Sequence, residues 1–127
     1  MKLEDQVCSL ELANRLKELG IKQHSICYWW QYDKDSWHLT IAVYPTSPKN
    51  YISAFTVAEL GEMLPSWING HHLIITKAST WFLRYRAPSS FIPKEEDPEI
   101  EDENEANARA KMLIYLIENA LIKIKEQ

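Results

Sequence analysis

The amino-acid sequence predicts an α+β fold with a four-stranded antiparallel sheet, built from two hairpins, and three helices in the order α-β-β-α-β-β-α. Two observations favour it. Three segments repeat apolar residues at helical spacing, and they stand before, between and after two pairs of short runs rich in aromatic and β-branched residues. Turn-forming residues separate the runs of each pair, and the helices are expected mainly on one face of the sheet.

The first helix is expected over residues 10–19. Ser9 is a suitable N-cap residue, and Gly20 followed by Ile21 is typical of a Schellman ending in which Ile21 contacts Leu16.

The first hairpin is expected to pair residues 26–32 with 37–43 across the polar turn 33–36. In its second strand an apolar set alternates with a mostly polar one, so one face of the sheet should be buried. The apolar set is Trp37, Leu39, Ile41 and Val43. A loop containing two prolines is expected over residues 44–50.

The middle helix begins with a capping box, in which the Thr56 hydroxyl accepts from the backbone of Glu59 and the Glu59 carboxylate accepts from the backbone of Thr56. Phe55 and Leu60 are placed as the matching hydrophobic staple. The helix should end near Leu64, because a proline follows it.

The second hairpin is expected to pair residues 71–76 with 80–86 across 77–79. The next segment, 88–104, is rich in proline, serine and acids, and residues 95–105 are dense in carboxylates. Such a segment repels itself, so we expect an acidic mobile loop.

The last helix is expected from about Glu105 to Lys123, with Asp102 or Asn104 as its cap. Its apolar stripe predicts that it packs across the sheet as the main core element, and its near-heptad spacing would also suit self-association. The stripe consists of Ala106, Ala110, Leu113, Ile117, Leu121 and Ile124.

One domain over residues 1–127 is expected, since this length suits a single core. The formal net charge of −4 argues against non-specific binding to nucleic acid or anionic membranes. The N-terminus is acidic where a secretory signal is basic, and no apolar run approaches the roughly 20 residues that span a bilayer. We therefore expect a cytoplasmic protein that binds no membrane. Cys8 and Cys27 lack metal-ligand spacing and are expected to be reduced core thiols.

Three stretches, Leu10–Gly20, Ser53–Pro65 and Glu105–Asn119, resemble a family of small uncharacterised bacterial proteins that are often labelled hypothetical or phage-related. The resemblance covers all three predicted helices. It implies a bacterial or prophage setting for a small stand-alone protein, and it implies no activity and no site residues.

Chemical motifs are few. His71 and His72 are adjacent and would point to opposite faces of a strand, so a metal site would need one of them to join His38 or a carboxylate. Ser79 or Cys27 with His38 is formally a nucleophile and base, but no nucleophile elbow or phosphate-binding loop accompanies them. We predict no metal, cofactor or catalytic residue, and enzyme activity is the less favoured interpretation.

The aromatic strands are more suggestive of binding. Sheets stack single-stranded bases on exposed aromatic residues that lie beside arginines. Here one set of aromatic residues shares a face of the first strand, and an aromatic residue shares a face of the last strand with two arginines. These candidate binding residues are Tyr28, Trp30, Tyr32, Phe82, Arg84 and Arg86. Core packing of the aromatics, with the arginines on a solvated face, is the competing interpretation.

The leading functional hypothesis is a non-enzymatic binding or accessory protein that acts through a protein partner or by self-association. Single-stranded nucleic-acid binding by the sheet residues is the first alternative, although the net charge disfavours it. A metal-assisted hydrolase is the second.

Overall fold

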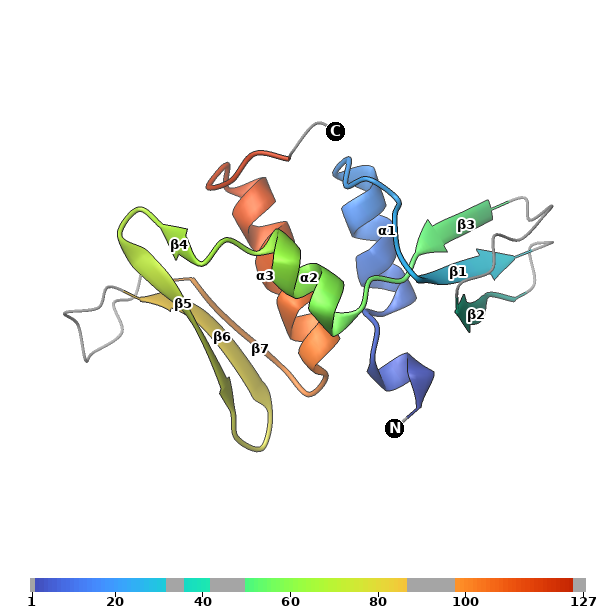
Figure 1. Cartoon of the computed structure of the whole chain (residues 1–127), viewed down its shortest axis with the longest axis horizontal. Coiled ribbons are helices and arrows are strands. Elements are labelled where there is room, and N and C mark those ends of the chain that lie inside the picture. The colour runs from blue at the N-terminus through green and yellow to red at the C-terminus, as the bar shows by residue number, and fades with distance from the viewer. Residues whose placement is uncertain (1, 32–35, 42–49, 87–97, 125–127) are drawn as a thin grey trace.

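The computed structural model describes residues 2–31, 36–41, 50–86 and 98–124. Three helices, α1 (Leu10–Glu18), α2 (Val57–Met63) and α3 (Glu105–Glu118), form a central layer between two antiparallel sheets (Figure 1). The α+β class is confirmed, and so are both hairpins. The two hairpins do not join in one sheet, however, because each lies on its own side of the helical layer.

The first sheet has three strands in the order β2-β1-β3. β1 (Cys27–Gln31) and β2 (His38–Ile41) form the predicted hairpin, and β3 (Asn50–Ser53) pairs with the other edge of β1. The predicted loop 44–50 is wrong at its last residue, because Asn50 is the first residue of β3. The rest of that loop lies outside the described residues, which omit 42–49. The sequence did not reveal β3, because its stability comes from pairing with β1, which is remote along the chain.

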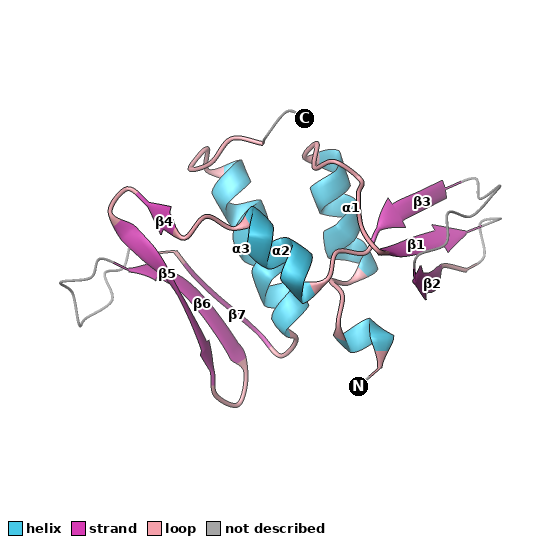
Figure 2. Cartoon of the chain, in the orientation of Figure 1, coloured by secondary structure: helices cyan, strands magenta, loops and turns pink. Residues whose placement is uncertain are grey.

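The second sheet has four strands in the order β4-β5-β6-β7, shown as arrows in Figure 2. β5 (His71–Lys77) and β6 (Trp81–Arg86) form the predicted hairpin, flanked by the unpredicted edge strands β4 (Trp67–Ile68) and β7 (Glu99–Asp102).

The predicted loop 88–104 is therefore wrong over β7. Partners in β6 and its turn offset the repulsion between acids there, since Glu99 forms an ion pair with Arg84 at 3.3 Å and Glu101 accepts a hydrogen bond from Thr80 at 2.8 Å. Between these acids, Ile100 pairs with Leu83 and packs against the core. Residues 87–97 lie outside the described part of the chain.

The predicted starts of the helices are confirmed. The hydroxyl of Ser9 accepts from the amide of Leu12, and the capping box of α2 is complete in both directions. Gly20, with φ of 95°, closes α1 in a Schellman turn in which the amide of Ile21 donates to the carbonyl of Leu16.

The predicted end of α3 is wrong. The helix stops at Glu118 instead of near Lys123, because Ala120 adopts φ of 55° and the amide of Leu121 turns back to donate to the carbonyl of Leu116. This is the same kind of helix ending, formed here by an alanine where glycine is the usual residue.

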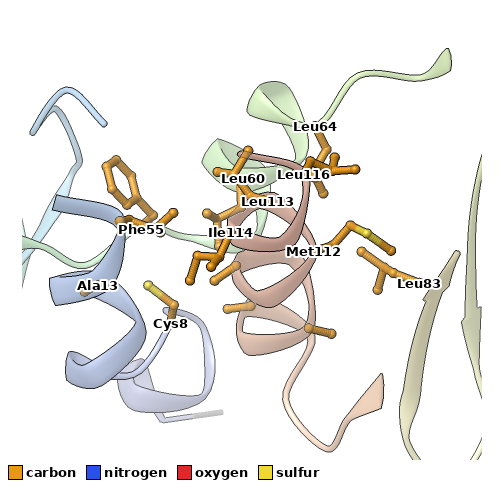
Figure 3. Packing of buried hydrophobic residues seen from close by; sticks show 14 of the residues in the cluster. Cys8, Ala13, Phe55, Leu60, Leu64, Leu83, Met112, Leu113, Ile114 and Leu116 are labelled. Carbon is orange, nitrogen blue, oxygen red and sulfur yellow. The ribbon is translucent and has the colours of Figure 1, made fainter. Parts of the chain in front are cut away.

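The core surrounds α3, which packs on two sides (Figure 3). One side meets the second sheet, where Met112 approaches Leu83, and the other meets the remaining helices, where Leu60 and Phe55 are fully buried. Helix α3 is thus the main core element, as predicted, although its buried surface is wider than the predicted stripe. In the first sheet the apolar face is only partly covered, since Ile41 is 54% exposed.

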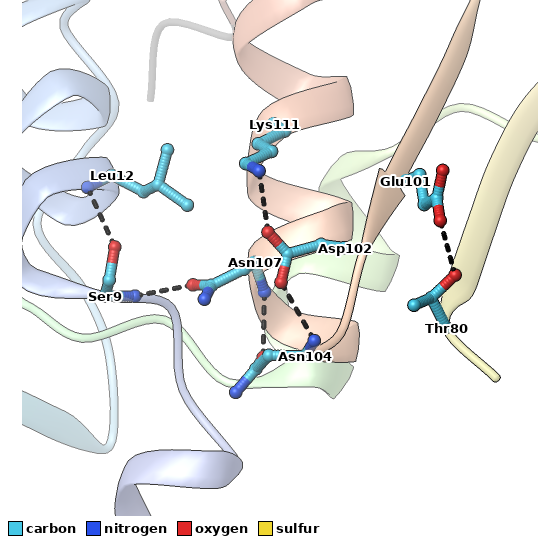
Figure 4. Close-up of polar contacts among 8 residues, drawn as sticks. All are labelled: Ser9, Leu12, Thr80, Glu101, Asp102, Asn104, Asn107 and Lys111. Atoms are coloured by element: carbon cyan, nitrogen blue, oxygen red, sulfur yellow. Dashed lines mark hydrogen bonds and ion pairs between the residues drawn. The ribbon is translucent and has the colours of Figure 1, made fainter.

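A chain of polar contacts ties the start of α3 to the start of α1 (Figure 4). Asn104 caps α3 by accepting from the amide of Asn107, whose side chain accepts from the amide of Ser9 at 2.7 Å. Asp102 accepts from the amide of Asn104 at 2.8 Å and pairs with Lys111 at 2.6 Å. These contacts fix α1, α3 and β7 relative to one another.

Candidate functional site

The best candidate for a functional surface is the face of the second sheet that points away from the helices, which we call the outer face. Leu83 and Tyr85 of β6 are buried toward the helical layer, so the alternate residues of that strand point outward. Cross-strand pairing then assigns the other strands. The outer face consists of Trp67, His72, Ile74, Thr76, Phe82, Arg84, Arg86, Glu99 and Glu101.

At one end of the outer face, three residues form a row across β4, β5 and β6. Trp67 pairs with His72, which pairs with Arg86. The indole of Trp67 lies 5.4 Å from the imidazole of His72, between ring centroids, and Trp67 is 57% exposed. An exposed tryptophan held by a neighbouring ring offers apolar contact area at little entropic cost.

The two arginines of the outer face differ in their electrostatic surroundings. Arg84 pairs with Glu99, whereas Arg86 has no carboxylate partner among the residues that the structure describes. The Nε atoms of both arginines and Nδ1 of His72 are buried without a hydrogen-bond partner within the described residues. A row containing Trp67, His72 and Arg86 therefore presents positive charge that this part of the chain does not neutralise.

The structure divides the six candidate binding residues between two sheets. Phe82, Arg84 and Arg86 come together on the outer face, as their spacing predicted. Tyr28 and Trp30 share a face of the first sheet instead, on the other side of the helical layer (Figure 1), and Tyr32 lies outside the described residues. Single-stranded bases would therefore meet two separate surfaces rather than one platform.

On the first sheet the aromatic rings pack against one another. Trp30 lies 4.7 Å from His38 and Tyr28 lies 6.0 Å from Tyr51, between ring centroids. Tyr28 is only 3% exposed, so its ring is not presented for stacking on a ligand.

Sequence reasoning missed Trp67 and His72 as members of the site. The signal was present in Asn69-Gly70, whose positive φ values of 48° and 80° form the tight turn between β4 and β5. Asn-Gly is a strong indicator of a two-residue hairpin turn, and applying it would have placed Trp67 opposite His72.

The structure brings together neither of the two catalytic combinations that the sequence allowed. His38 lies in the first sheet, whereas His71 and His72 occupy opposite faces of the second, and the described residues contain no group of three or more histidines, cysteines or acids arranged to hold a metal. Ser79 follows β5, on the far side of the helices from His38. Cys27 and His38 both belong to the first sheet, but they point to its opposite faces, because Cys27 pairs with Ile41 and His38 pairs with Trp30.

The cysteines are buried free thiols, confirming them as core residues. Burial raises the pKa of Cys8 to about 12 and also raises the pKa of Cys27, with a smaller contribution from Glu59 in each case. Neither is activated as a nucleophile, since activation requires a lowered pKa.

Comparison of the chain with protein-family models, with curated proteins and with solved structures gave no match. Among the described residues, no helix combines the length and apolar character required to cross a bilayer. The geometry of this α+β domain is therefore the basis for assigning a function.

Proposed function

We propose that this is a non-enzymatic binding protein of bacterial or prophage origin, acting in the cytoplasm, and that it engages a protein partner through the outer face. The observation that carries the proposal is the row of Trp67, His72 and Arg86, in which a 57% exposed tryptophan stands beside an arginine that lacks a counter-charge in the described part of the chain.

The row matches the chemistry of protein-binding hot spots, which are enriched in tryptophan and arginine. We expect the partner to present a carboxylate to Arg86 next to an apolar side chain that covers Trp67. Such a carboxylate would form a charge-assisted hydrogen bond of the stronger kind.

Single-stranded nucleic acid is the alternative ligand, and it draws less support. Glu99 and Glu101 share the outer face with the two arginines, and the chain carries a net charge of −4. Nucleic-acid binding depends on summed positive charge, whereas a protein partner needs only local complementarity.

Site-specific photo-crosslinking tests the proposal. A benzophenone amino acid replaces Trp67 in bacteria that express the protein. Ile26, which is 58% exposed and immediately precedes β1 of the other sheet, provides a control position of matched exposure. We expect a discrete protein adduct from position 67 that position 26 does not give. The adduct should be lost in Arg86→Glu and retained in Arg86→Lys.

With the partner identified by mass spectrometry, Trp67→Ala should weaken its binding by about 30-fold or more, since a hot-spot residue contributes about 2 kcal/mol or more. Equal adducts at positions 67 and 26, or adducts indifferent to Arg86→Glu, would reject the outer face as a binding surface. An adduct between two copies of the chain would show that the outer face binds a second copy of this protein and not a different protein.

A further inference from the structure

The two-residue turn between β4 and β5 leaves its polar groups unshielded (Figure 1). Asn69 and Gly70 are both exposed, and their φ angles are 48° and 80°. Among the described residues, neither the side chain of Asn69 nor the amide of Gly70 has a hydrogen-bond partner. A β-carbon placed on Gly70 would meet no other part of the chain within 4 Å. The amide nitrogen of Gly70 is therefore open to approach by the Asn69 side chain.

His71 makes the amide proton of Gly70 easier to remove. Its Nδ1 lies 3.0 Å from the backbone carbonyl oxygen of Asn69, and Nδ1 must carry the proton because a carbonyl oxygen can only accept. This carbonyl and the Gly70 nitrogen belong to one peptide group, so negative charge on the nitrogen is shared with the oxygen by resonance. A donor that already points at the oxygen stabilises that charge as it develops.

The turn is also held by a short pairing. β4 contains only Trp67 and Ile68, which pair with His72 and His71. Such a short pairing at the edge of a sheet opens more readily than a central one. The left-handed backbone of Asn69 is itself less favourable than a right-handed or extended one. Opening of the turn then lets Asn69 rotate and bring its side-chain carbonyl carbon to the Gly70 nitrogen.

We propose that Asn69 is a site of spontaneous deamidation, and that the isoaspartate formed there separates Trp67 from His72. The Gly70 nitrogen gives its proton to water or hydroxide and attacks Cγ of Asn69. As the bond between this nitrogen and Cγ forms, the bond from Cγ to Nδ2 breaks, and Nδ2 takes up a proton and leaves as ammonia. Water then opens the cyclic imide. Its addition at Cγ gives aspartate, and its addition at the backbone carbonyl carbon gives isoaspartate.

Isoaspartate alters the turn because the main chain then runs through Cβ and Cγ of residue 69 and is one atom longer. A two-residue turn with positive φ at both positions does not accommodate the extra atom. The pairing of β4 with β5 is lost with it, and so is the contact between the rings of Trp67 and His72, whose centroids lie 5.4 Å apart. Aspartate keeps the chain length and tolerates the left-handed conformation, so it preserves the contact.

Incubation of the full chain at mildly alkaline pH and physiological temperature, followed by peptide mass spectrometry, tests the proposal. We expect the peptide that contains Asn69 to gain the mass difference between NH and O, and to be labelled by isoaspartyl methyltransferase. Asn14 and Asn119 are internal controls, because each is exposed, precedes a residue other than glycine and donates a side-chain hydrogen bond. Conversion at Asn69 should be at least about tenfold faster, since glycine has no β-carbon to hinder the attack.

Variants of the turn test each part of the chemistry. His71→Phe removes the donor and should slow conversion roughly fivefold, the factor that corresponds to one ordinary hydrogen bond. His24→Phe, which changes a histidine outside both sheets, is the matched control and should leave the rate unchanged. Gly70→Ala places a β-carbon beside the attacking nitrogen and should slow conversion about tenfold or more, so it tests the site even if His71→Phe does not fold.

The isoaspartate form can be separated by ion-exchange chromatography and compared by NMR. Nuclear Overhauser effects between the rings of Trp67 and His72 should be present in the natural chain and in freshly prepared Asn69→Asp, and absent from the isoaspartate form. The crosslinked adduct from position 67 should be lost as well, an expectation that rests on the proposed function. If the proposed function is wrong, fresh protein gives no such adduct either, while the mass-spectrometric result is unaffected.

Three results would overturn the proposal. The first is conversion at Asn69 that is no faster than at Asn14 and Asn119. The second is an equal rate of conversion in His71→Phe and in the natural chain. The third is an isoaspartate form that keeps the Overhauser effects between Trp67 and His72.

Discussion

The contact between α2 and α3 gives the sharpest test of how the helices pack. Gly61 of α2 faces the guanidinium of Arg109, and a β-carbon at Gly61 would overlap Nη1 of Arg109 and lie 3.5 Å from its Cζ. Arg109 cannot simply swing away, because Nε and Nη2 both donate to Oε2 of Glu105, at 3.0 and 2.6 Å. The two side chains are only 17% and 20% exposed.

The substitution Gly61→Ala therefore sets two effects against each other. Alanine is favoured over glycine in a helix by about 1 kcal/mol. Displacing Arg109 weakens a partly buried, charge-assisted pair worth about 1.5–3 kcal/mol. We expect Gly61→Ala to lower the free energy of unfolding by about 1 kcal/mol in the natural chain, and to raise it by about 1 kcal/mol in an Arg109→Ala background.

Urea denaturation of the four proteins in this double-mutant cycle measures the coupling, expected to be about 2 kcal/mol. Gly70→Ala is the control, because Gly70 has φ of 80° and a β-carbon added there would meet no atom within 4 Å. The loss of unfolding free energy in Gly70→Ala comes only from the backbone conformation, so it should be equal in the natural chain and in the Arg109→Ala background. A Gly61→Ala variant as stable as expected from helix propensity alone, with no coupling to Arg109, would refute the close approach of α2 and α3.

Three further predictions concern stability. Burial raises the pKa of Cys8 from 9.0 and that of Tyr85 from 10.0, each to about 12, so the native state holds protons that the unfolded chain releases. The free energy of unfolding should therefore keep its full value below about pH 9 and fall as the pH rises toward 12. In Cys8→Ala the urea midpoint should fall less steeply over this range. Burial works to raise the pKa of Asp102, but hydrogen bonds and charge from Lys111 and the amide of Asn104 lower it below 3.8 overall. Its contribution is therefore present above about pH 4 and lost in stronger acid, and Asp102→Asn should flatten the acid limb of a pH-stability curve. Thr56→Ala removes a cap and should cost about 1 kcal/mol by urea denaturation, whereas Thr76→Ala on the exposed outer face should cost less.

Much of the fold was predictable because its signals are local. Ser9, Gly20 and the pair Thr56 and Glu59 act on backbone groups only a few residues away, so their roles could be recognised before any tertiary structure was known. The two hairpins were predictable for the same reason, since each joins strands that are neighbours along the chain.

The candidate site was predictable only in part. The alternation of β6 correctly placed Phe82, Arg84 and Arg86 on one face, because alternation is a property of a single strand. The Asn69-Gly70 turn could have added Trp67 and His72 to this face, but separating it from Tyr28 and Trp30 required knowledge of which sheet each strand joins.

The sequence by itself determined where helices begin, which strands form hairpins and which face each strand residue takes, because caps, turns and alternation act over a few residues. Only the tertiary structure decided that the hairpins stand in separate sheets on either side of α3 and that β3 and β7 exist. Those features depend on contacts between segments far apart in the chain, and short strands gain their stability from such partners rather than from their own residues.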